Sequence, residues 1–493
     1  MTKTLIALSA VAALTTTSFA STTDVDKRLS KMEKKIKKLE KKLKKANKKL
    51  NMVKAHDFGD NIKWDVDFRS TVDKINYKLS DGTEASADNV LANRLLLNMK
   101  FKADERVTFY GTLANNKTFG DTANHSQSNT NPGYADFDWV TNENMTDDTM
   151  KVKEAYWLYA NDTFMGKDMP WTASIGRRPS TGGLGINYRE GDKRKSAIAS
   201  TVNIEFDGIS LRWNTDQVGG PEGSWFKICA GRGITNANPR FTMSGTDYAN
   251  NTSLHGNSDM IGIIVVPFDN GQYSFHTNYA KASHMVGFDS NGTAYKAVDG
   301  TYSATPTTIR NGTAMPAFQD VGDFSIMTAM FKAEGIGEEI NDFLDATTFF
   351  ASYSRSVTSP KSGHVMLGSP DSKTGNSIWL GAQMPCPITE DGRFGIEWNK
   401  GSKYWRSMTY GEDTVIGSKI AARGTALEFY WFKPLTPSLT LNIRHTSIKY
   451  DYTGSNSFFG AEGVPMTMAQ AQAQGQNPVK EATDTRFSIR YRF

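Results

Sequence analysis

From residue 58 to the C-terminus the sequence alternates between apolar and polar residues, and this period of two limits the possible folds more than any other feature. At the C-terminus, Phe487, Ile489, Tyr491 and Phe493 alternate with Ser488, Arg490 and Arg492. Successive side chains of a β-strand point to opposite faces of the sheet, so this segment has one apolar and one basic face. The same pattern recurs at residues 62–69, 91–101, 209–213, 394–398 and 439–443, although Leu96 breaks it. The alternation predicts an all-β domain over residues 58–493.

Together with these six segments, eleven further stretches bring the number of candidate strands to seventeen. The eleven are 106–114, 151–160, 170–177, 200–206, 224–232, 259–268, 272–281, 322–333, 345–357, 376–384 and 424–433. Most are near the 9–11 residues that a tilted strand needs to cross a bilayer. A bacterial membrane barrel has an even number of strands. Reading 200–213 as one strand gives 16, whereas reading Asp207-Gly208 as a hairpin turn and adding a missed strand gives 18; we favour 16.

A soluble β-sandwich or solenoid and a membrane barrel both fit an all-β chain, and three features favour the barrel. The apolar strand faces are aromatic while the opposite faces are charged, short turns alternate with long polar connections such as 178–199 and 400–423, and the chain stops at the end of a strand. A membrane barrel directs its apolar face outward, the reverse of a soluble barrel. Mean hydropathy is −0.48, and no run of 18 apolar residues follows position 20, which excludes a polytopic helical membrane protein.

The N-terminal 57 residues contain two other kinds of segment. Residues 1–20 have a basic start at Lys3, a short apolar stretch and small residues at Ser18 and Ala20, which predicts an export signal peptide. Residues 24–55 then carry an unbroken heptad pattern, which predicts a coiled coil. Its apolar seam is Leu29, Met32, Ile36, Leu39, Leu43, Ala46, Leu50 and Val53.

The predicted coiled coil is strongly basic, with fourteen basic and four acidic residues between Asp24 and Lys54. An isolated helix with so many like charges is marginal in water, so we expect self-association, most simply as a trimer. The lysines are either a solvated face or a surface for a polyanion such as phospholipid headgroups or the peptidoglycan cell wall. An exported chain is not expected to bind nucleic acid.

The signal peptide, the heptad helix, the alternating region and the C-terminal Arg-Tyr-Arg-Phe resemble a porin-type outer-membrane protein. More narrowly, the chain resembles an uncharacterised porin-like family of epsilonproteobacteria that has a lysine-rich coiled coil before the barrel. The resemblance implies a barrel in the bacterial outer membrane, surrounded by its lipid, with the coiled coil in the periplasm holding a homotrimer. It also implies that the barrel-assembly machinery reads Phe493, and that the protein is a passive channel for small hydrophilic solutes.

A barrel of about 16 strands leaves an aqueous interior, and charges along it set ion selectivity. On seven well-patterned strands the inward positions hold ten basic and three acidic residues. In porins of this size the loop after the fifth strand narrows the pore, and residues 178–199 correspond to it. We therefore predict a basic, anion-preferring constriction; the alternative is an exposed loop facing lipopolysaccharide. The predicted selectivity residues are Arg94, Arg177, Arg178, Arg189, Lys193, Arg194, Arg212, Arg444 and Arg490.

The sequence offers little for catalysis or metal binding. Cys229 and Cys386 are too few for a zinc site, the seven histidines lack ligand spacing, and the glycine-rich stretches do not follow a phosphate-loop pattern. We expect no enzyme activity, no cofactor and no metal, while a disulfide between the two cysteines stays open. Besides a channel, two functions fit: a tether between outer membrane and cell wall, and a surface module that binds another cell or macromolecule through long loops.

Overall fold

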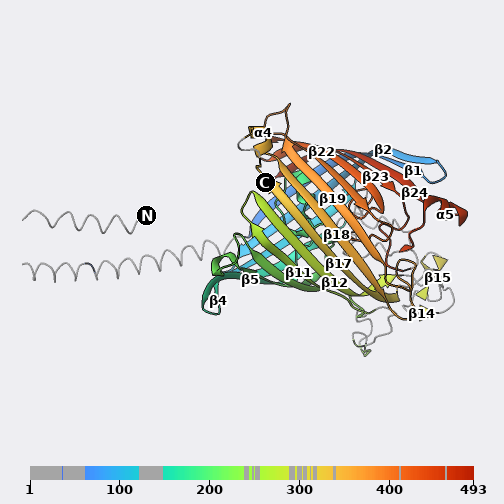
Figure 1. Ribbon diagram of the computed structural model, residues 1–493, viewed down its shortest axis with the longest axis horizontal. Helices are drawn as coiled ribbons and strands as arrows, with labels where there is room; N and C mark the ends of the chain where they lie inside the picture. The colour runs from blue at the N-terminus through green and yellow to red at the C-terminus, as the bar shows by residue number, and fades with distance from the viewer. Residues whose placement is uncertain are drawn as a thin grey trace, which may run out of the picture. The chain divides into compact units, whose positions relative to one another are not determined.

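Sixteen antiparallel strands close into a barrel in which each strand pairs with its neighbours along the chain and β24 returns to β1 (Figure 1). The computed structural model describes residue 36 and residues 62–493, apart from 121–147, 238–243, 247–248, 250–255, 288–294, 297–301, 304–307, 311–312, 315–318, 337–339, 410–411, 413 and 461–462. The barrel strands are β1 (Lys63–Leu79), β2 (Glu84–Lys102), β3 (Val107–Thr118), β4 (Lys151–Phe164), β5 (Lys167–Arg177), β9 (Asp207–Asn214), β10 (Trp225–Ile234), β11 (Ser258–Asp269), β12 (Tyr273–Gly287), β17 (Gln319–Glu334), β18 (Thr348–Pro360), β19 (Thr374–Pro385), β20 (Arg393–Gly401), β22 (Gly424–Thr436), β23 (Leu439–Tyr450) and β24 (Val479–Arg492). The favoured strand number of 16 is confirmed.

Short elements connect the barrel strands. They are β6 (Gly183–Leu184), η3 (Ile186–Glu190), β7 (Ser196–Ile198), β8 (Val202–Asn203), η4 (Asp216–Val218), β13 (Tyr295–Lys296), β14 (Tyr302–Ser303), β15 (Thr308–Arg310), β16 (Thr313–Ala314), α4 (Asp342–Asp345), β21 (Met408–Thr409) and α5 (Met468–Ala473). Among the described residues, no helix has both the length and the apolar character needed to cross a membrane.

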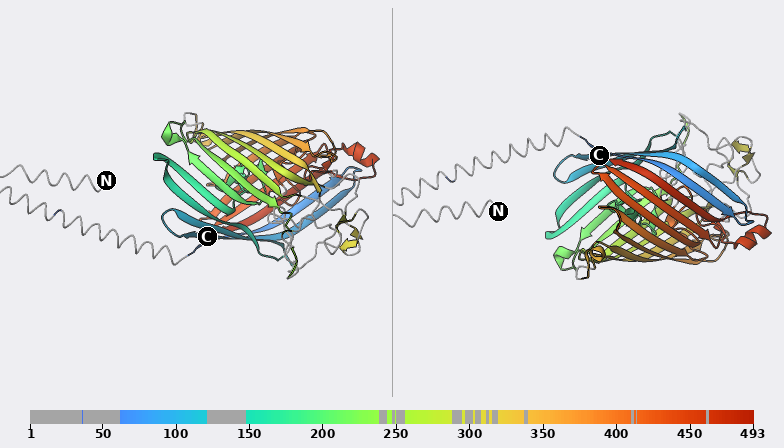
Figure 2. Two further views of the ribbon diagram at one scale, coloured as in Figure 1. Left: turned by 90° about the horizontal axis from the view of Figure 1, so that it is seen from below. Right: turned by 90° about the horizontal axis from the view of Figure 1, so that it is seen from above.

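The two ends of the barrel differ in their connections. The C-terminus lies at one end, where the Phe493 N–H donates to the Val66 carbonyl at 3.0 Å, and α5 lies at the other end (Figure 2). Turns at the Phe493 end are mostly short, such as Met165-Gly166 between β4 and β5. Connections at the far end are mostly long, among them residues 178–206 and 402–423. The predicted alternation of short and long connections is therefore present.

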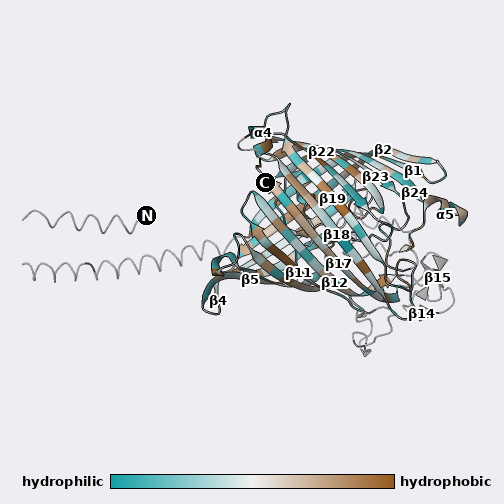
Figure 3. Cartoon of the chain, viewed as in Figure 1, coloured by the Kyte–Doolittle hydropathy of each residue, from teal (hydrophilic) through white to brown (hydrophobic). Residues whose placement is uncertain are grey.

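The outer and inner faces of the wall have opposite chemistry. Hydrophobic and hydrophilic residues alternate along the strands in Figure 3, and exposed outward side chains include Phe68, Ile261, Phe331, Ile378 and Ile443. Their inward neighbours are polar and covered, such as Arg69, Thr328, Ser377, Arg444 and Thr446. Alternating side chains thus place apolar groups outside and polar groups inside, as the sequence pattern predicted.

Two sequence-based expectations about the far end were wrong. Residues 200–206 are no part of a barrel strand: β9 begins at Asp207, and Gly208 pairs with Gly231 inside the sheet, so Asp207-Gly208 is not a turn. Residues 200–206 lie inside the barrel instead: Ile204 and Glu205 are buried, and Glu205 forms an ion pair with Lys153 Nζ at 2.6 Å. Most described residues of 402–423, which were predicted to belong to a long polar connection, are likewise covered, and the apolar side chains of Trp405, Met408 and Ile420 are buried among them.

The predicted signal peptide and all but one of the coiled-coil seam residues lie outside the described residues. Ile36 is the exception, and it is helical and exposed. Cys229 on β10 and Cys386 after β19 are both free thiols, so the disulfide left open by the sequence does not form.

Candidate functional site

Two connections fold into the barrel and meet there. We call residues 179–206 the first inner loop and residues 402–423 the second inner loop. Strand β8 of the first pairs in parallel with β21 of the second, through Val202 with Met408 and Asn203 with Thr409. Both inner loops therefore occupy the interior of the barrel, whereas the sequence predicted only the first of them there.

The first inner loop spans the barrel from wall to wall. On one side Glu190 accepts a hydrogen bond from Arg69 on β1 at 2.7 Å. On the opposite side the Arg194 guanidinium lies 3.0 Å from His276 Nδ1 on β12. In the order of the barrel strands β1 and β12 are eight steps apart, half of the circumference. The loop therefore crosses the full diameter.

Apolar packing fixes the loop against the wall. Leu184, Ile186 and Ile198 from the first inner loop form one cluster with Phe350 and Trp379 of the wall and Ile420 of the second inner loop. Each buried side chain of this size contributes roughly 1.5–3 kcal/mol. Gly185 has φ 98°, and a Cβ at this position would lie 2.2 Å from the Trp379 ring. Glycine is therefore required here, both for the backbone conformation and for the close approach.

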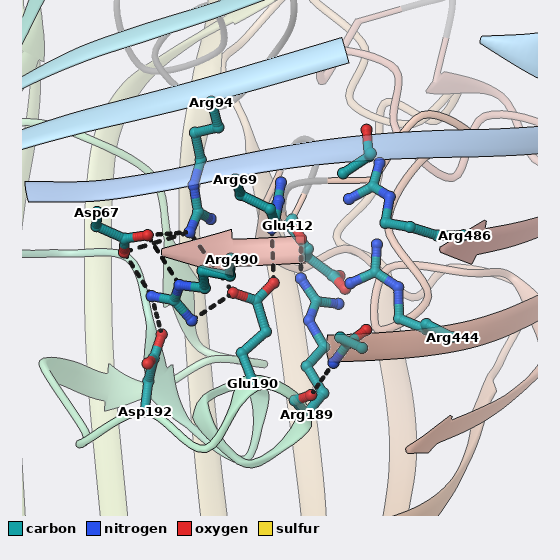
Figure 4. A network of polar contacts seen from close by, with 12 residues as sticks. Asp67, Arg69, Arg94, Arg189, Glu190, Asp192, Glu412, Arg444, Arg486 and Arg490 are labelled. Carbon is teal, nitrogen blue, oxygen red and sulfur yellow. Dashed lines mark hydrogen bonds and ion pairs between the residues drawn. The ribbon is translucent and has the colours of Figure 1, made fainter. Parts of the chain in front are cut away.

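Glu190 and Asp192 of the first inner loop bind arginines of the wall, as Figure 4 shows, and we call these two carboxylates the acidic clamp. Glu190 accepts from Arg69 at 2.7 Å and from Arg490 at 2.8 Å, and Asp192 accepts from Arg490 at 3.0 Å and from Arg492 at 2.8 Å. Burial by itself raises the pKa of Glu190, but the guanidinium groups of Arg69, Arg94 and Arg490 hold that pKa well below its usual range. The carboxylate is thus charged at neutral pH and ties the loop to β1 and β24.

A second buried charge cluster joins the second inner loop to the wall. Lys419 is almost fully covered, and its Nζ lies 2.6 Å from Glu397 Oε2 and also contacts Glu428. Arg189 reaches over from the first inner loop, 3.8 Å from Glu428, and donates to the Glu412 carbonyl. Burial raises the pKa of Glu412 to about 8, so its carboxyl group is mainly protonated at neutral pH. Arg189 accordingly binds the backbone of Glu412.

Four cations of the interior, Arg178, Arg194, Arg212 and Lys227, have a different environment, and we call them the basic row. Arg212 and Lys227 are register partners on β9 and β10. Arg212 and Arg194 both lie against the Trp225 ring, at 4.1 and 5.6 Å, and Arg178 lies 5.7 Å from the Tyr156 ring. Within the described chain, none of the four has a carboxylate within ion-pair distance. No described carboxylate within ion-pair distance therefore compensates the positive charge of the row.

Two cavities lie on either side of the first inner loop. The larger, of about 990 Å³, is near the Phe493 end, where Asp269, Glu334 and Arg393 contribute to its lining. The smaller, of about 90 Å³, lies beside Arg94 and Lys195. Asn187 and Asp192 line both, so this part of the loop is the partition between them.

The nine predicted selectivity residues have five different environments. Arg178, Arg194 and Arg212 belong to the basic row. Arg94 and Arg490 lie by the acidic clamp, paired with Asp67 and Glu190. Arg189 and Arg444 are buried beside Glu428, and Arg177 lies 3.6 Å from Asp207. Lys193 is exposed and lines the smaller cavity.

Sequence reasoning missed Lys227 and both acidic partners of the clamp, Glu190 and Asp192. Lys227 had a signal in the sequence, because it lies between Trp225 and Cys229 on the inward face of a predicted strand. No local sequence signal identified the acidic clamp, because Arg69 and Arg490, which bind Glu190, are about 120 and 300 residues away from it along the chain. The described residues contain no group of three or more His, Cys, Asp or Glu side chains placed to hold a metal ion.

Comparison with known proteins gives one family and a set of distant structures. A family model described as "Protein of unknown function (DUF3373)" matches residues 84–493. Among solved structures, OprB of Pseudomonas putida is 12% identical, with a TM-score of 0.45 over 90% of this chain and 96% of that one. An anion-selective porin from Comamonas acidovorans is 11% identical, with a TM-score of 0.45 over 88% and 100%. OmpF of Salmonella typhi, in complex with daunomycin, is 12% identical, with a TM-score of 0.43 over 89% and 99%. No curated protein matches the chain.

Proposed function

Because the chain belongs to DUF3373, a family of proteins of unknown function, we propose its function from the barrel itself: a passive outer-membrane channel for small hydrophilic solutes that prefers anions. The outer face supports the membrane location. Exposed aromatic and aliphatic side chains such as Trp64, Phe275 and Tyr353 alternate with covered polar ones along the strands. Such a surface is unfavourable in water and favourable in hydrocarbon, and a closed barrel leaves no unpaired strand edge in the bilayer.

The divided interior supports a narrow, selective channel. A solute that enters from the Phe493 end meets the 990 Å³ cavity first and then the first inner loop. Beyond the partition at Asn187 and Asp192 only about 90 Å³ is free in the smaller cavity. A constriction of this size brings any permeating ion close to charged side chains, where selectivity is decided.

The basic row is the observation that carries the anion preference. Most other charges of the interior are paired: Arg490 with Asp67 and Glu190, Lys153 with Glu205, and Lys419 with Glu397 and Glu428. Paired charges largely cancel at the distance of a passing ion. Arg178, Arg194, Arg212 and Lys227 lack such a partner in the described chain, so we expect them to add a net positive field along the wall formed by β9 and β10.

We expect the purified barrel, reconstituted in planar bilayers, to conduct, and its reversal potential in a KCl gradient to have the sign of an anion-preferring pore. A charge about 4 Å from an ion is worth about 1 kcal/mol even at the dielectric constant of water. Allowing for screening by salt, the triple variant R178Q/R212Q/K227Q is expected to lower the anion-to-cation permeability ratio by about tenfold. Arg355 lies on the outer face of β18 and is exposed, so R355Q is the matched control and should leave the ratio unchanged.

The outcomes of that experiment separate the parts of the proposal. A barrel that is folded, by its heat-modifiable gel mobility, but does not conduct contradicts the channel. A conducting barrel that prefers cations, or a triple variant with the selectivity of R355Q, contradicts the role of the basic row and leaves the channel in place.

The heptad seam and the charge of residues 24–55 support two additional roles, a homotrimer held by the coiled coil and a tether to the anionic cell wall. Deleting residues 24–55 removes the seam and a net charge of about ten. We expect the deletion variant to have one third of the parent mass in solution and to stop co-sedimenting with purified sacculi, while the barrel still conducts. Unchanged mass and unchanged sedimentation would contradict both roles.

A further inference from the structure

A cavity of about 480 Å³ lies at the end of the barrel away from Phe493, apart from the two cavities beside the first inner loop. It is formed by the ends of β1, β23 and β24, by Ile416 and Gly417 of the second inner loop, and by residues 452–458. Every residue of the described chain that lines it is uncharged. This separates the cavity from the rest of the interior, where arginine, lysine and carboxylate groups are abundant.

Aromatic rings make up much of the wall of this cavity. Tyr77, Tyr450, Tyr452 and Phe458 come from three different segments and all line it. The Tyr77 hydroxyl donates to the Val415 carbonyl at 3.2 Å, which fixes its ring against the second inner loop. Tyr77 and Tyr450 also pack on an apolar cluster that contains Ile416, Ile448 and Ala482. The rings are therefore held in place before any ligand arrives.

Polar groups converge on one point between the rings. A Cβ built on Gly417 would lie 3.5 Å from the Tyr450 hydroxyl oxygen and 3.6 Å from Asn456 Nδ2. The Tyr450 hydroxyl has no hydrogen-bond partner among the described residues, although it can both donate and accept. Ser457 adds another hydroxyl-bearing side chain to the lining. The absence of a side chain at Gly417 thus leaves open the space that these groups face.

We propose that this cavity binds a neutral sugar, one or two units in size. Sugar rings carry hydroxyl groups, which match Tyr450, Asn456 and Ser457, and C–H faces, which match the electron-rich faces of aromatic rings. A charged ligand would find no counter-ion in the described lining, and a purely apolar ligand would leave the Tyr450 hydroxyl without a hydrogen-bond partner. The volume is within the range of small-molecule sites. The proposal does not depend on conduction.

The chemistry is shared by a free saccharide and by the sugar chain of a lipid at the membrane surface, so both are tested. Probes are maltose, sucrose and lactose, and, separately, an uncharged O-antigen polysaccharide from lipopolysaccharide, each titrated calorimetrically into the full chain in detergent. We expect at least one neutral probe to bind and gluconate, a sugar acid, not to bind. The probe that binds decides the source.

Two matched glycine variants test the location. Gly417 has φ 98° and Gly475 has φ 75°, so G417A and G475A introduce similar backbone strain. Only G417A adds a methyl group inside the cavity, because nothing lies within 4 Å of a Cβ at Gly475. We expect G417A and N456A to weaken binding at least tenfold, and G475A to bind like the parent. No binding of any neutral probe by the parent chain, or equal binding by folded G417A and G475A, would overturn the proposal whether or not the barrel conducts.

Discussion

Replacing Glu190 by glutamine is expected to release the first inner loop from the wall and to raise the conductance of the channel. Glu190 accepts ion-pair contacts from Arg69 at 2.7 Å, Arg490 at 2.8 Å and Arg94 at 3.6 Å. Removing one partner of a buried charged cluster costs about 3–5 kcal/mol, because the remaining charges stay buried without compensation. Here the cost falls on the closed position of the loop, which partitions the interior. Single-channel recordings should show a larger conductance with more frequent transitions between levels.

The same substitution should also shift ion selectivity. E190Q removes one negative charge and leaves Arg94 with Asp67, and Arg490 with Asp67 and Asp192. The narrow part of the interior becomes more positive, so the anion-to-cation permeability ratio rises. Glu222 is exposed in the turn before β10, and E222Q is the control for loss of a carboxylate elsewhere. If E190Q and E222Q have the conductance and selectivity of the parent, the clamp does not hold the loop.

Replacing Lys419 by methionine is expected to destabilise the barrel by about 3–5 kcal/mol. Lys419 is the central cation between Glu397 and Glu428, both of which are covered. Methionine has a similar length but no charge, and it leaves two carboxylates side by side in the interior. Glu428 keeps Arg189 at 3.8 Å and a hydrogen bond from Thr446 at 2.7 Å, which limits the loss. The free energy of unfolding in urea, followed by tryptophan fluorescence, measures the change.

A second substitution distinguishes the charge effect from simple loss of packing. In K419M/E397Q the amide can still accept the hydrogen bond that Trp379 Nε1 gives Glu397 at 2.9 Å, and one buried charge is gone. We expect the double variant to recover at least half of the lost stability. K400M, at an exposed outward position on β20, should be as stable as the parent. If the double variant is no more stable than K419M, the cost is due to packing.

Apolar residues at inward positions show what the alternation pattern could and could not predict about the interior. Leu96 broke the alternation of the second predicted strand; in the structure it points inward, pairs with Asp67 and lines the smaller cavity with Ile186 of the first inner loop. This exception to the alternation therefore marked a position where the first inner loop lies against the inner face of the wall. Trp405, Met408 and Ile420 carried the same kind of signal in a segment that was predicted to be a long polar connection. An apolar residue at an inward position indicates an inner partner, but it does not identify that partner.

The sequence alone indicated the barrel and the direction of its faces, because side-chain alternation is a local property of each strand and every strand repeats it. It favoured 16 strands over 18, and the structure has 16. Only the tertiary structure decided which charged side chains of the interior are paired with an opposite charge and which are not. Glu190 meets Arg490 across 300 residues, whereas Arg178, Arg194, Arg212 and Lys227 meet no carboxylate in the described chain. The net electrostatic field inside the barrel depends on distances between side chains that are remote in sequence. Electrostatic energy depends on the separation of two charges in space and not on their separation along the chain.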